Sequence, residues 1–214
     1  MTTALAPTAP PRWQLLYSPR AWRRWFAAKS ARIRDAHSER AYDQLAPFVP
    51  AGARVVDVGA WDGRLGRLLR DRRGCDVTLV DVVDHNVTDL PFQVYDGRNL
   101  PLADADRDRV IVMYVLHHAA DDLAVLREAR RVCRADGRVL VAEDRVDTVG
   151  EKVRTIGFHA WLATFTFMGW TRFRKEHAWR ARFAAAGLRV EEVVPLGAVG
   201  ALWPRNVLYV LAPA

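Results

Sequence analysis

The 214-residue sequence has few cysteines and no long apolar run or internal repeat. Its two cysteines, Cys75 and Cys133, are far apart in the sequence and have neither ligand nor redox spacing, which argues against a disulfide framework. The longest uncharged run, residues 155–171, falls below the roughly 18 apolar residues of a membrane-spanning helix. The first residues lack the basic and apolar regions of a secretory signal. We therefore expect reduced thiols and a cytoplasmic protein.

Positive charge is concentrated in two segments. The formal net charge is +7, and residues 1–50 carry eight Lys/Arg against three Asp/Glu. Residues 148–187 carry seven against two, whereas residues 51–147 are net negative. A basic excess is typical of proteins that bind nucleic acid or a membrane surface. A solvated arginine-rich surface is the preferred explanation, so no nucleic-acid partner is predicted, while peripheral membrane contact stays open. The sequence indicates no oligomeric state.

The chain alternates between strand and helix patterns. Residues 13–48 have helical spacing of apolar side chains. Further helices are predicted near 63–73, 121–135 and 176–186. Strands are predicted at 53–59, 76–82, 92–96, 109–116, 137–144, 188–196 and 206–212. This alternation is the pattern of a parallel sheet built from βαβ units.

The connection between the last two predicted strands is short, which favours an antiparallel hairpin. We therefore predict an α/β fold: a Rossmann-like seven-stranded mixed sheet with a C-terminal antiparallel hairpin and helices on both faces. Residues 1–50 are interpreted as an N-terminal helical cap. The main domain is expected over 51–214, with a lid insertion at about 148–175.

Polar or small residues follow each of the first four predicted strands. The first strand leads into Gly59 in the segment VVDVGAWDGRLG, and the second ends at Asp81. The third ends at Asp96-Gly97 and the fourth at His117-His118. Ligands of open α/β sheets bind at the carboxyl ends of the strands, where these residues would meet. A carboxylate in the position of Asp81 can accept hydrogen bonds from both hydroxyls of a ribose.

These segments, in this order, resemble the small-molecule type of class I S-adenosylmethionine-dependent methyltransferases. The resemblance rests on VVDVGAWDGRLG, VDVVD, YDGRNLPL and VMYVLHH, and it covers about residues 50–147 and 176–213. It implies S-adenosylmethionine as cofactor. The implied reaction is methyl transfer to an O, N or C nucleophile of a small, partly apolar metabolite.

The resemblance also implies a role for each matching position. The methionine and ribose portion is expected to contact Asp57, Gly59, Ala60, Trp61 and Gly63, and the ribose hydroxyls are expected to contact Asp81. The adenine is expected to contact Val82, Val83, Asp96 and Gly97. Tyr114 and Leu116 are expected near the sulfonium. Trp61 departs from the glycine-rich family pattern, so its side chain must leave the cofactor path. Segment 148–175 follows the fifth strand, where relatives place their substrate cover. Substrate contacts are expected from His159, Trp161 and Arg145.

His117 and His118 are the candidate catalytic residues. A neutral imidazole near an acceptor hydroxyl can take its proton as the methyl group arrives. Structural capping of the loop explains the two histidines about as well. Likewise, the aromatic residues of segment 148–175 fit an ordinary core-packing helix as an alternative to a lid. No Cys, His or Asp cluster has metal-ligand spacing, and no metal site is predicted.

Three other functions remain to be weighed. A nicotinamide-binding GxGxxG motif starting at Gly59 fails at Trp61 and Arg64, which disfavours an oxidoreductase. An RNA or DNA methyltransferase is compatible with the basic segments, but the fourth strand is not followed by an Asn/Asp-Pro-Pro-Tyr tetrad. A non-catalytic protein of the same fold that has lost cofactor binding through Trp61 is the third alternative.

Overall fold

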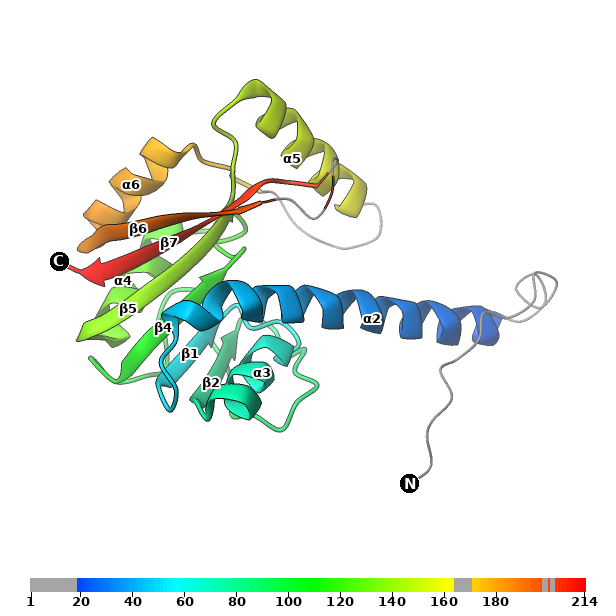
Figure 1. Cartoon of the computed structure of the whole chain (residues 1–214), viewed down its shortest axis with the longest axis horizontal. Coiled ribbons are helices and arrows are strands. Elements are labelled where there is room, and N and C mark those ends of the chain that lie inside the picture. Colours follow the sequence, from blue (N-terminus) through cyan, green and yellow to red (C-terminus); the bar gives the residue numbers. More distant parts are fainter. Residues whose placement is uncertain (1–18, 164–170, 198–199, 201–202) are drawn as a thin grey trace.

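The computed structural model describes residues 19–163, 171–197, 200 and 203–214, and contains one seven-stranded sheet (Figure 1). The strands are β1 (Arg54–Val58), β2 (Asp76–Asp81), β3 (Phe92–Val94), β4 (Arg107–Met113), β5 (Cys133–Asp144), β6 (Leu188–Gly197) and β7 (Asn206–Pro213). Their order across the sheet is β3-β2-β1-β4-β5-β7-β6. All seven predicted strands are present, and the predicted α/β class is confirmed.

The sheet is parallel from β3 to β5 and antiparallel beyond. Strand β1 pairs in parallel with β2 and β4, and β4 pairs in parallel with β5. Strand β7 runs antiparallel to both of its neighbours, β5 and β6. The predicted hairpin of the last two strands is therefore confirmed, and its β7 arm lies inside the sheet.

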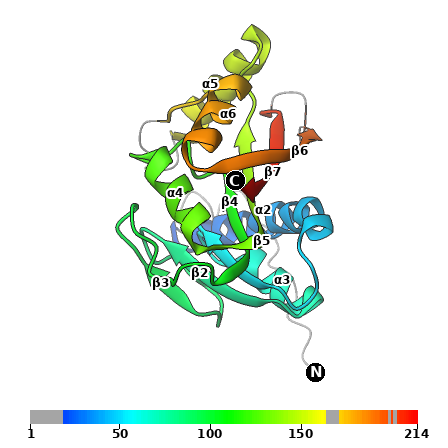
Figure 2. The ribbon, with the colours of Figure 1, turned by 90° about the vertical axis from the view of Figure 1, so that its left-hand side faces the viewer.

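Two hydrophobic cores lie on opposite faces of the sheet. Alternate residues of a strand point to opposite faces, and here each face receives valine, isoleucine, leucine or alanine. One core contains Val56, Val58, Val110, Val112, Val139 and Val141, and the other contains Val55, Ile111, Leu140 and Ala142. Because both faces are apolar, the central strands need helices on each side. Figure 2 shows α4 and α6 on one side and α2 and α3 on the other.

The helices are α2 (Pro19–Leu45), α3 (Arg64–Arg73), α4 (Asp122–Val132), α5 (Val149–Ala163) and α6 (Glu176–Ala185), and residues 46–48 form one 3-10 turn. Helices α3, α4 and α6 match the prediction. Helix α5 lies in segment 148–175, for which the sequence predicted a core-packing helix only as an alternative to a lid. It lies beyond the end of β5 (Figure 1). Among the described residues, no helix is long and apolar enough to span a membrane.

Helix α2 is one continuous helix whose C-terminal part is attached to the sheet. Leu45 is completely buried in the core beside α3. Arg72 of α3 binds Glu39 with two hydrogen bonds of 2.7 Å. The N-terminal part of the helix extends past the sheet (Figure 1). Residues 13–18, which were also predicted to be helical, lie outside the described residues.

Candidate functional site

The turn after β1 is shaped by backbone that favours glycine. Gly59 and Gly63 have φ values of +75° and +76°, in the left-handed region. A Cβ atom at Gly59 would collide with the side chain of Val115, and one at Gly63 would lie 2.6 Å from Leu79 Cδ1. The turn therefore lies tightly against the strands on both sides and leaves its backbone accessible to a ligand at the start of α3.

Asp81 organises the same turn from the end of β2. Its Oδ2 accepts a hydrogen bond of 2.8 Å from the Trp61 backbone N–H, and its Oδ1 accepts one of 2.7 Å from the Val82 N–H. Each carboxylate oxygen still has a second lone pair. Asp81 thus joins the first turn to the second strand and can accept further hydrogen bonds.

Trp61 has a left-handed backbone conformation, and its side chain points away from the turn. Its φ is +50°, which is uncommon for a residue other than glycine. The indole is 53% exposed and packs against His85, with ring centroids 4.9 Å apart. The side chain therefore lies against the loop that follows β2, and the backbone N–H remains bound to Asp81.

Asp57 lies beneath the turn and is 3% exposed. No hydrogen bond to its carboxylate occurs within the described part of the chain. Burial, followed by the negative charges of Asp81 and Asp62, raises the pKa of Asp57 to about 7. A cationic ligand group beside this carboxylate would relieve the repulsion and favour the charged form.

The predicted adenine residues form the neighbouring surface. Val82 and Val83 are about half exposed, at 53% and 50%. A Cβ atom at Gly97 would lie 3.5 Å from Val82, so Gly97 and Val82 are adjacent. Asp96 is engaged locally: hydrogen bonds from the Asn99 backbone and side chain and from the Arg98 backbone lower the pKa of Asp96 to about 2.

The three residues after β4, Tyr114, Val115 and Leu116, have side chains in three different places. Tyr114 has a φ of +57°, and its ring lies in the core on the α2 side. The side-chain amide of Asn206 joins Tyr114 to Asp144. Its oxygen accepts a hydrogen bond of 2.7 Å from the Tyr114 hydroxyl, and its nitrogen donates one of 3.0 Å to Asp144 Oδ1. Leu116 is 1% exposed and belongs to the other core. Val115, which sequence reasoning missed, packs on Gly59.

His117 is held by a buried carboxylate at the end of β5. Its Nδ1 lies 2.6 Å from Glu143 Oε2, while Glu143 Oε1 accepts a hydrogen bond of 2.9 Å from the Leu116 N–H. Both side chains are at most 2% exposed. Burial opposes the charged imidazole, yet the Glu143 carboxylate raises the pKa of His117 above its ordinary value.

His118 and His159 are beside His117. The ring centroids of His117 and His118 are 4.2 Å apart, and those of His117 and His159 are 5.3 Å apart. Burial, followed by the two neighbouring histidines, lowers the pKa of His118 to about 4. Burial also lowers the pKa of His159. The predicted catalytic pair and one predicted substrate residue therefore share one cluster.

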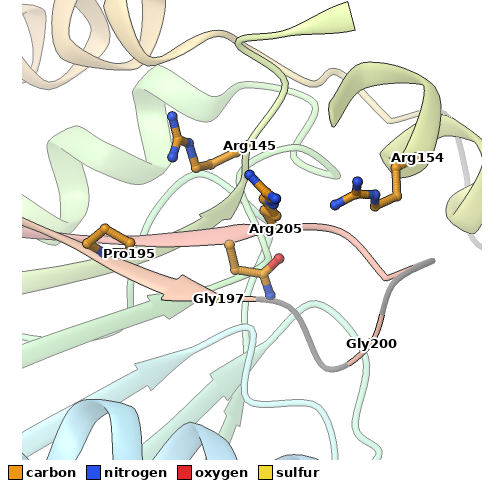
Figure 3. Close-up of a pocket in the computed structure, with 7 residues that line it drawn as sticks. Arg145, Arg154, Pro195, Gly197, Gly200 and Arg205 are labelled. Carbon is orange, nitrogen blue, oxygen red and sulfur yellow. The ribbon is translucent and has the colours of Figure 1, made fainter. Parts of the chain in front are cut away.

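Arg145 lines a pocket of about 620 Å³ next to this cluster. Figure 3 shows Arg145, Arg154 and Arg205 around it, with Arg154 pointing toward Arg205. Asn206, which contacts Tyr114 and Asp144, also lines the pocket. Arg145 is paired with Asp147 at 3.4 Å. Neither Arg154 nor Arg205 has an ion pair with any residue that the structure describes. Trp161 is 58% exposed on α5.

Helix α2 reaches the first turn through charged side chains. Arg64, at the start of α3, binds Asp35 of α2 at 2.8 Å and also pairs with Asp62. Arg34 of α2 lies 3.4 Å from Asp62. The helix is therefore fixed beside the Gly59–Gly63 turn.

The comparison with known proteins decides the family. A family model described as a methyltransferase domain matches residues 28–193, which include every strand from β1 to β5 and end before β7. The chain belongs to the methyltransferase-domain family. This methyltransferase-family chain has the class I fold that the sequence predicted.

Curated relatives match part of their length. The ubiquinone/menaquinone biosynthesis C-methyltransferase of Caulobacter vibrioides (strain NA1000 / CB15N) is 27% identical over 133 residues, covering 56% of this chain and 50% of that protein. The 27-O-demethylrifamycin SV methyltransferase of Amycolatopsis mediterranei (strain S699) is 27% identical over 151 residues, covering 60% and 55%. The chain spans about half the length of these curated relatives.

A solved structure agrees over most of both chains. A chain in the complex between the Haloferax volcanii Trm112 methyltransferase activator and a methyltransferase superposes with a TM-score of 0.66 at 25% identity. The match covers 88% of this chain and 97% of that chain. The class I fold of this family member therefore extends through the C-terminal hairpin.

The residues present fit the cofactor of the family. Asp57 is a buried carboxylate with acidic neighbours, which suits the ammonium group of the methionine portion. Asp81 retains free lone pairs for the ribose, and the half-exposed Val82 and Val83 offer apolar surface to the adenine. Sequence reasoning did not assign Val115 or Asn206, and it did not foresee the pairing of Glu143 with His117.

Proposed function

We propose that the protein transfers a methyl group from S-adenosylmethionine to an O, N or C nucleophile of a small, partly apolar metabolite. The observation that carries this proposal is the division of one sheet edge. Carboxylates gather at the ends of β1 and β2. Imidazole, guanidinium and aromatic groups gather at the ends of β4 and β5 and at the start of β7, beside the buried carboxylates of Glu143 and Asp144. A cationic methyl donor and an acceptor would thus occupy adjacent halves of the site.

In this proposal each predicted cofactor residue has a role. The methionine and ribose would be surrounded by the backbone of Gly59, Ala60, Trp61 and Gly63, with Asp57 at the ammonium group and Asp81 at the ribose hydroxyls. The adenine would pack on Val82, Val83 and Gly97, and its amino group would donate to Asp96. Tyr114 would lie near the sulfonium. Leu116 would act through its position in the core beneath this edge, because its side chain is buried.

The acceptor would lie against the histidine cluster. His159 and Trp161 come from α5, and Arg145 borders the arginine-lined pocket. The unpaired guanidinium groups around that pocket favour an acceptor that carries a negative charge beside its apolar part. Residues 1–50 as a cap and 148–175 as a lid complete the proposed enclosure, with α2 and α5 as their described helices.

When bound, S-adenosylmethionine supplies an electrophilic methyl group on a positively charged sulfur. The protein contributes mainly alignment and exclusion of water, which are the principal sources of rate in a displacement of this kind. His118 is uncharged at neutral pH, as its lowered pKa requires, and can accept a hydrogen bond from the nucleophile. His117 would orient this loop through Glu143.

The test uses calorimetry with S-adenosylhomocysteine, the demethylated product, on the whole chain. Asp81→Ala removes a charge-assisted contact with two hydroxyls, worth roughly 1.5–3 kcal/mol, and affinity should fall at least about tenfold. Asp136→Ala, an exposed acidic residue away from the site, is the control. Unchanged affinity in Asp81→Ala would contradict the cofactor assignment.

The acceptor class is tested with labelled S-adenosylmethionine. Incubation with a metabolite extract should produce a labelled small molecule, while mixed RNA and duplex DNA should remain unlabelled. Binding of either polymer that falls steeply with salt, together with methyl incorporation, would replace the small-molecule proposal by a nucleic-acid one, because phosphate contacts give a strong salt dependence.

A further inference from the structure

Three histidines from two distant segments meet at the acceptor half of the site. His117 and His118 follow β4, and His159 lies on α5. One ring nitrogen of each lies within 4.8 Å of a ring nitrogen of both others. Within the described ranges, this is the one group of His, Cys, Asp or Glu side chains with the spacing of a metal site.

Two of the three rings have a partner that fixes their orientation. His117 Nδ1 binds the Glu143 carboxylate, and Glu143 is itself held by the Leu116 backbone. His159 Nδ1 lies 3.0 Å from the Thr155 carbonyl oxygen, to which it donates in the neutral ring. Histidine ligands of metals have the same arrangement: one ring nitrogen donates to a carboxylate or carbonyl, and the other carries the lone pair for the metal.

We propose that His117, His118 and His159 bind one divalent transition-metal ion of the zinc class. Three imidazoles form the ligand set of an open, catalytic type of zinc site, and imidazole also suits cobalt and nickel. Zinc–nitrogen bonds of about 2.0–2.1 Å place tetrahedral ligands about 3.3 Å apart. The ring nitrogens would therefore have to approach one another by at most about 1.5 Å. Rotation of the His118 side chain and a small shift of α5 can supply this change.

Two buried carboxylates accompany the cluster. Glu143 Oε2 lies 2.6 Å from His117 Nδ1, and Asp144 Oδ2 lies 3.5 Å from His159 Nε2. Asp144 therefore borders the position proposed for the ion, and both carboxylates would partly balance its charge.

The site has a chemical consequence for the reaction, and this consequence rests on the proposed function. Three protein ligands leave a position for a water molecule or an acceptor oxygen, and a divalent ion lowers the pKa of an oxygen bound to it. An acceptor hydroxyl held there would lose its proton to solvent and become a better nucleophile for the methyl group. With the ion bound, the lone pair of His118 would be used by the metal, and the ion would contact the nucleophile in place of His118. His118 and His159 both remain partly exposed, so the ion would be reachable from the acceptor side.

Distance in the sequence conceals this site. His159 follows His118 by a complete helix (α4), a complete strand (β5) and most of α5, so no short ligand motif is present. The expectation of no metal site rested on spacing alone. The structure adds a spatial juxtaposition and a set of orienting partners that spacing cannot show.

The test titrates Zn²⁺ and Co²⁺ into the whole chain, purified without an added histidine tag, by calorimetry and visible absorption. One equivalent should bind, and Co²⁺ should give the absorption of a low-coordinate site with nitrogen ligands. His118→Gln and His159→Gln should each weaken binding at least about tenfold. His177→Gln removes an exposed histidine on α6 and is the matched control. Thermal melting confirms that each variant is folded.

Wild-type affinity weaker than about 100 μM, or affinity unchanged in both His118→Gln and His159→Gln, would overturn the site. Binding of S-adenosylhomocysteine is measured on the same samples. A wild-type chain that binds no metal but still binds the product would reject the metal site and keep the proposed function. A wild-type chain that binds the metal but no product would keep the metal site and reject the proposed function. Methyl transfer that is equally fast with and without the ion would remove its role in activating the acceptor.

Discussion

The two halves of the strand edge differ in charge and in how the chain builds them. At the ends of β1 and β2, Asp57, Asp62 and Asp81 face a tight glycine turn, and all come from one stretch of the sequence. At the ends of β4, β5 and β7, histidines and arginines come from four separate segments. The first half suits a cationic cofactor, and the second suits an acceptor. The proposed cofactor half thus comes from one stretch of sequence, whereas the proposed acceptor half depends on long-range assembly of the fold.

The largest expected effect tests whether one buried carboxylate holds the acceptor half together. Glu143→Ala leaves His117 and the Leu116 N–H without their partner in a buried site. Removing one member of such a pair costs about 3–5 kcal/mol of unfolding free energy. Urea denaturation followed by circular dichroism measures the loss.

Glu192→Ala is the control for this experiment. Glu192 is exposed on β6, and its removal should change stability by no more than about 0.5 kcal/mol. If Glu143→Ala is as stable as this control, the acceptor half does not depend on the carboxylate, and the contrast between the two halves is smaller than the structure indicates.

The next effect concerns pH and isolates the cofactor half. In the free protein, burial and the neighbouring acids raise the pKa of Asp57 to about 7. Below that pH the carboxyl group holds a proton that the ammonium group of the product must displace. Affinity for S-adenosylhomocysteine should therefore fall as pH is lowered, by about tenfold between about pH 7.5 and pH 6.

Asp57→Asn separates this cause from the titration of the histidines. The variant should bind the product weakly and with no pH dependence over the same range. A wild-type affinity that is flat with pH would show that Asp57 does not meet the ammonium group. Calorimetry in buffers of different ionisation enthalpy would also count the proton released on binding.

The smallest expected effect concerns Trp61, the departure from the glycine-rich family pattern. A left-handed conformation costs a residue with a side chain about 1–2 kcal/mol, and Trp61→Gly would remove this cost. Glycine also gains freedom in the unfolded chain, which offsets roughly 0.5–1 kcal/mol. The net change in stability should be within about 1 kcal/mol, as measured by thermal melting.

Affinity for the product should be unchanged in Trp61→Gly, because Asp81 binds the backbone N–H and not the indole. Trp61→Pro is the informative counterpart, since it lacks the N–H and cannot adopt a positive φ. It should lose affinity. A large gain of affinity in Trp61→Gly would show that the indole obstructs the cofactor.

The sequence was sufficient for the fold because its signals are local. Alternating apolar strands and helices predicted every strand, and the short final connection predicted the hairpin. The glycine turn, Asp81 and the His117-His118 pair could also be located, because each adjoins a strand end. Their roles toward cofactor and acceptor stay predictions.

The acceptor half could not be predicted in the same way. Nothing near Glu143 in the sequence indicates that it will meet His117, since Glu143 ends β5 and His117 lies in the loop after the neighbouring strand β4. His159 lies on α5, which the sequence predicted only as an alternative to a lid, so its approach to His117 was not predicted. Asn206 reaches Tyr114 only because β7 is inserted beside β5. Such contacts depend on topology, which short motifs do not encode.

That insertion also orders the events of biosynthesis. During synthesis, residues 53–144 can pair into the parallel part of the sheet, with Val141 beside Val112 of β4, while the other edge of β5 still lacks its partner, because Val141 pairs there with Tyr209. Until residues 206–213 emerge from the ribosome, β5 has an open hydrogen-bonding edge, the kind of edge on which nascent chains aggregate. The Gly59–Gly63 turn can thus form early. The last strand closes the exposed edge of β5 and brings Arg205 and Asn206 to the pocket that Arg145 lines.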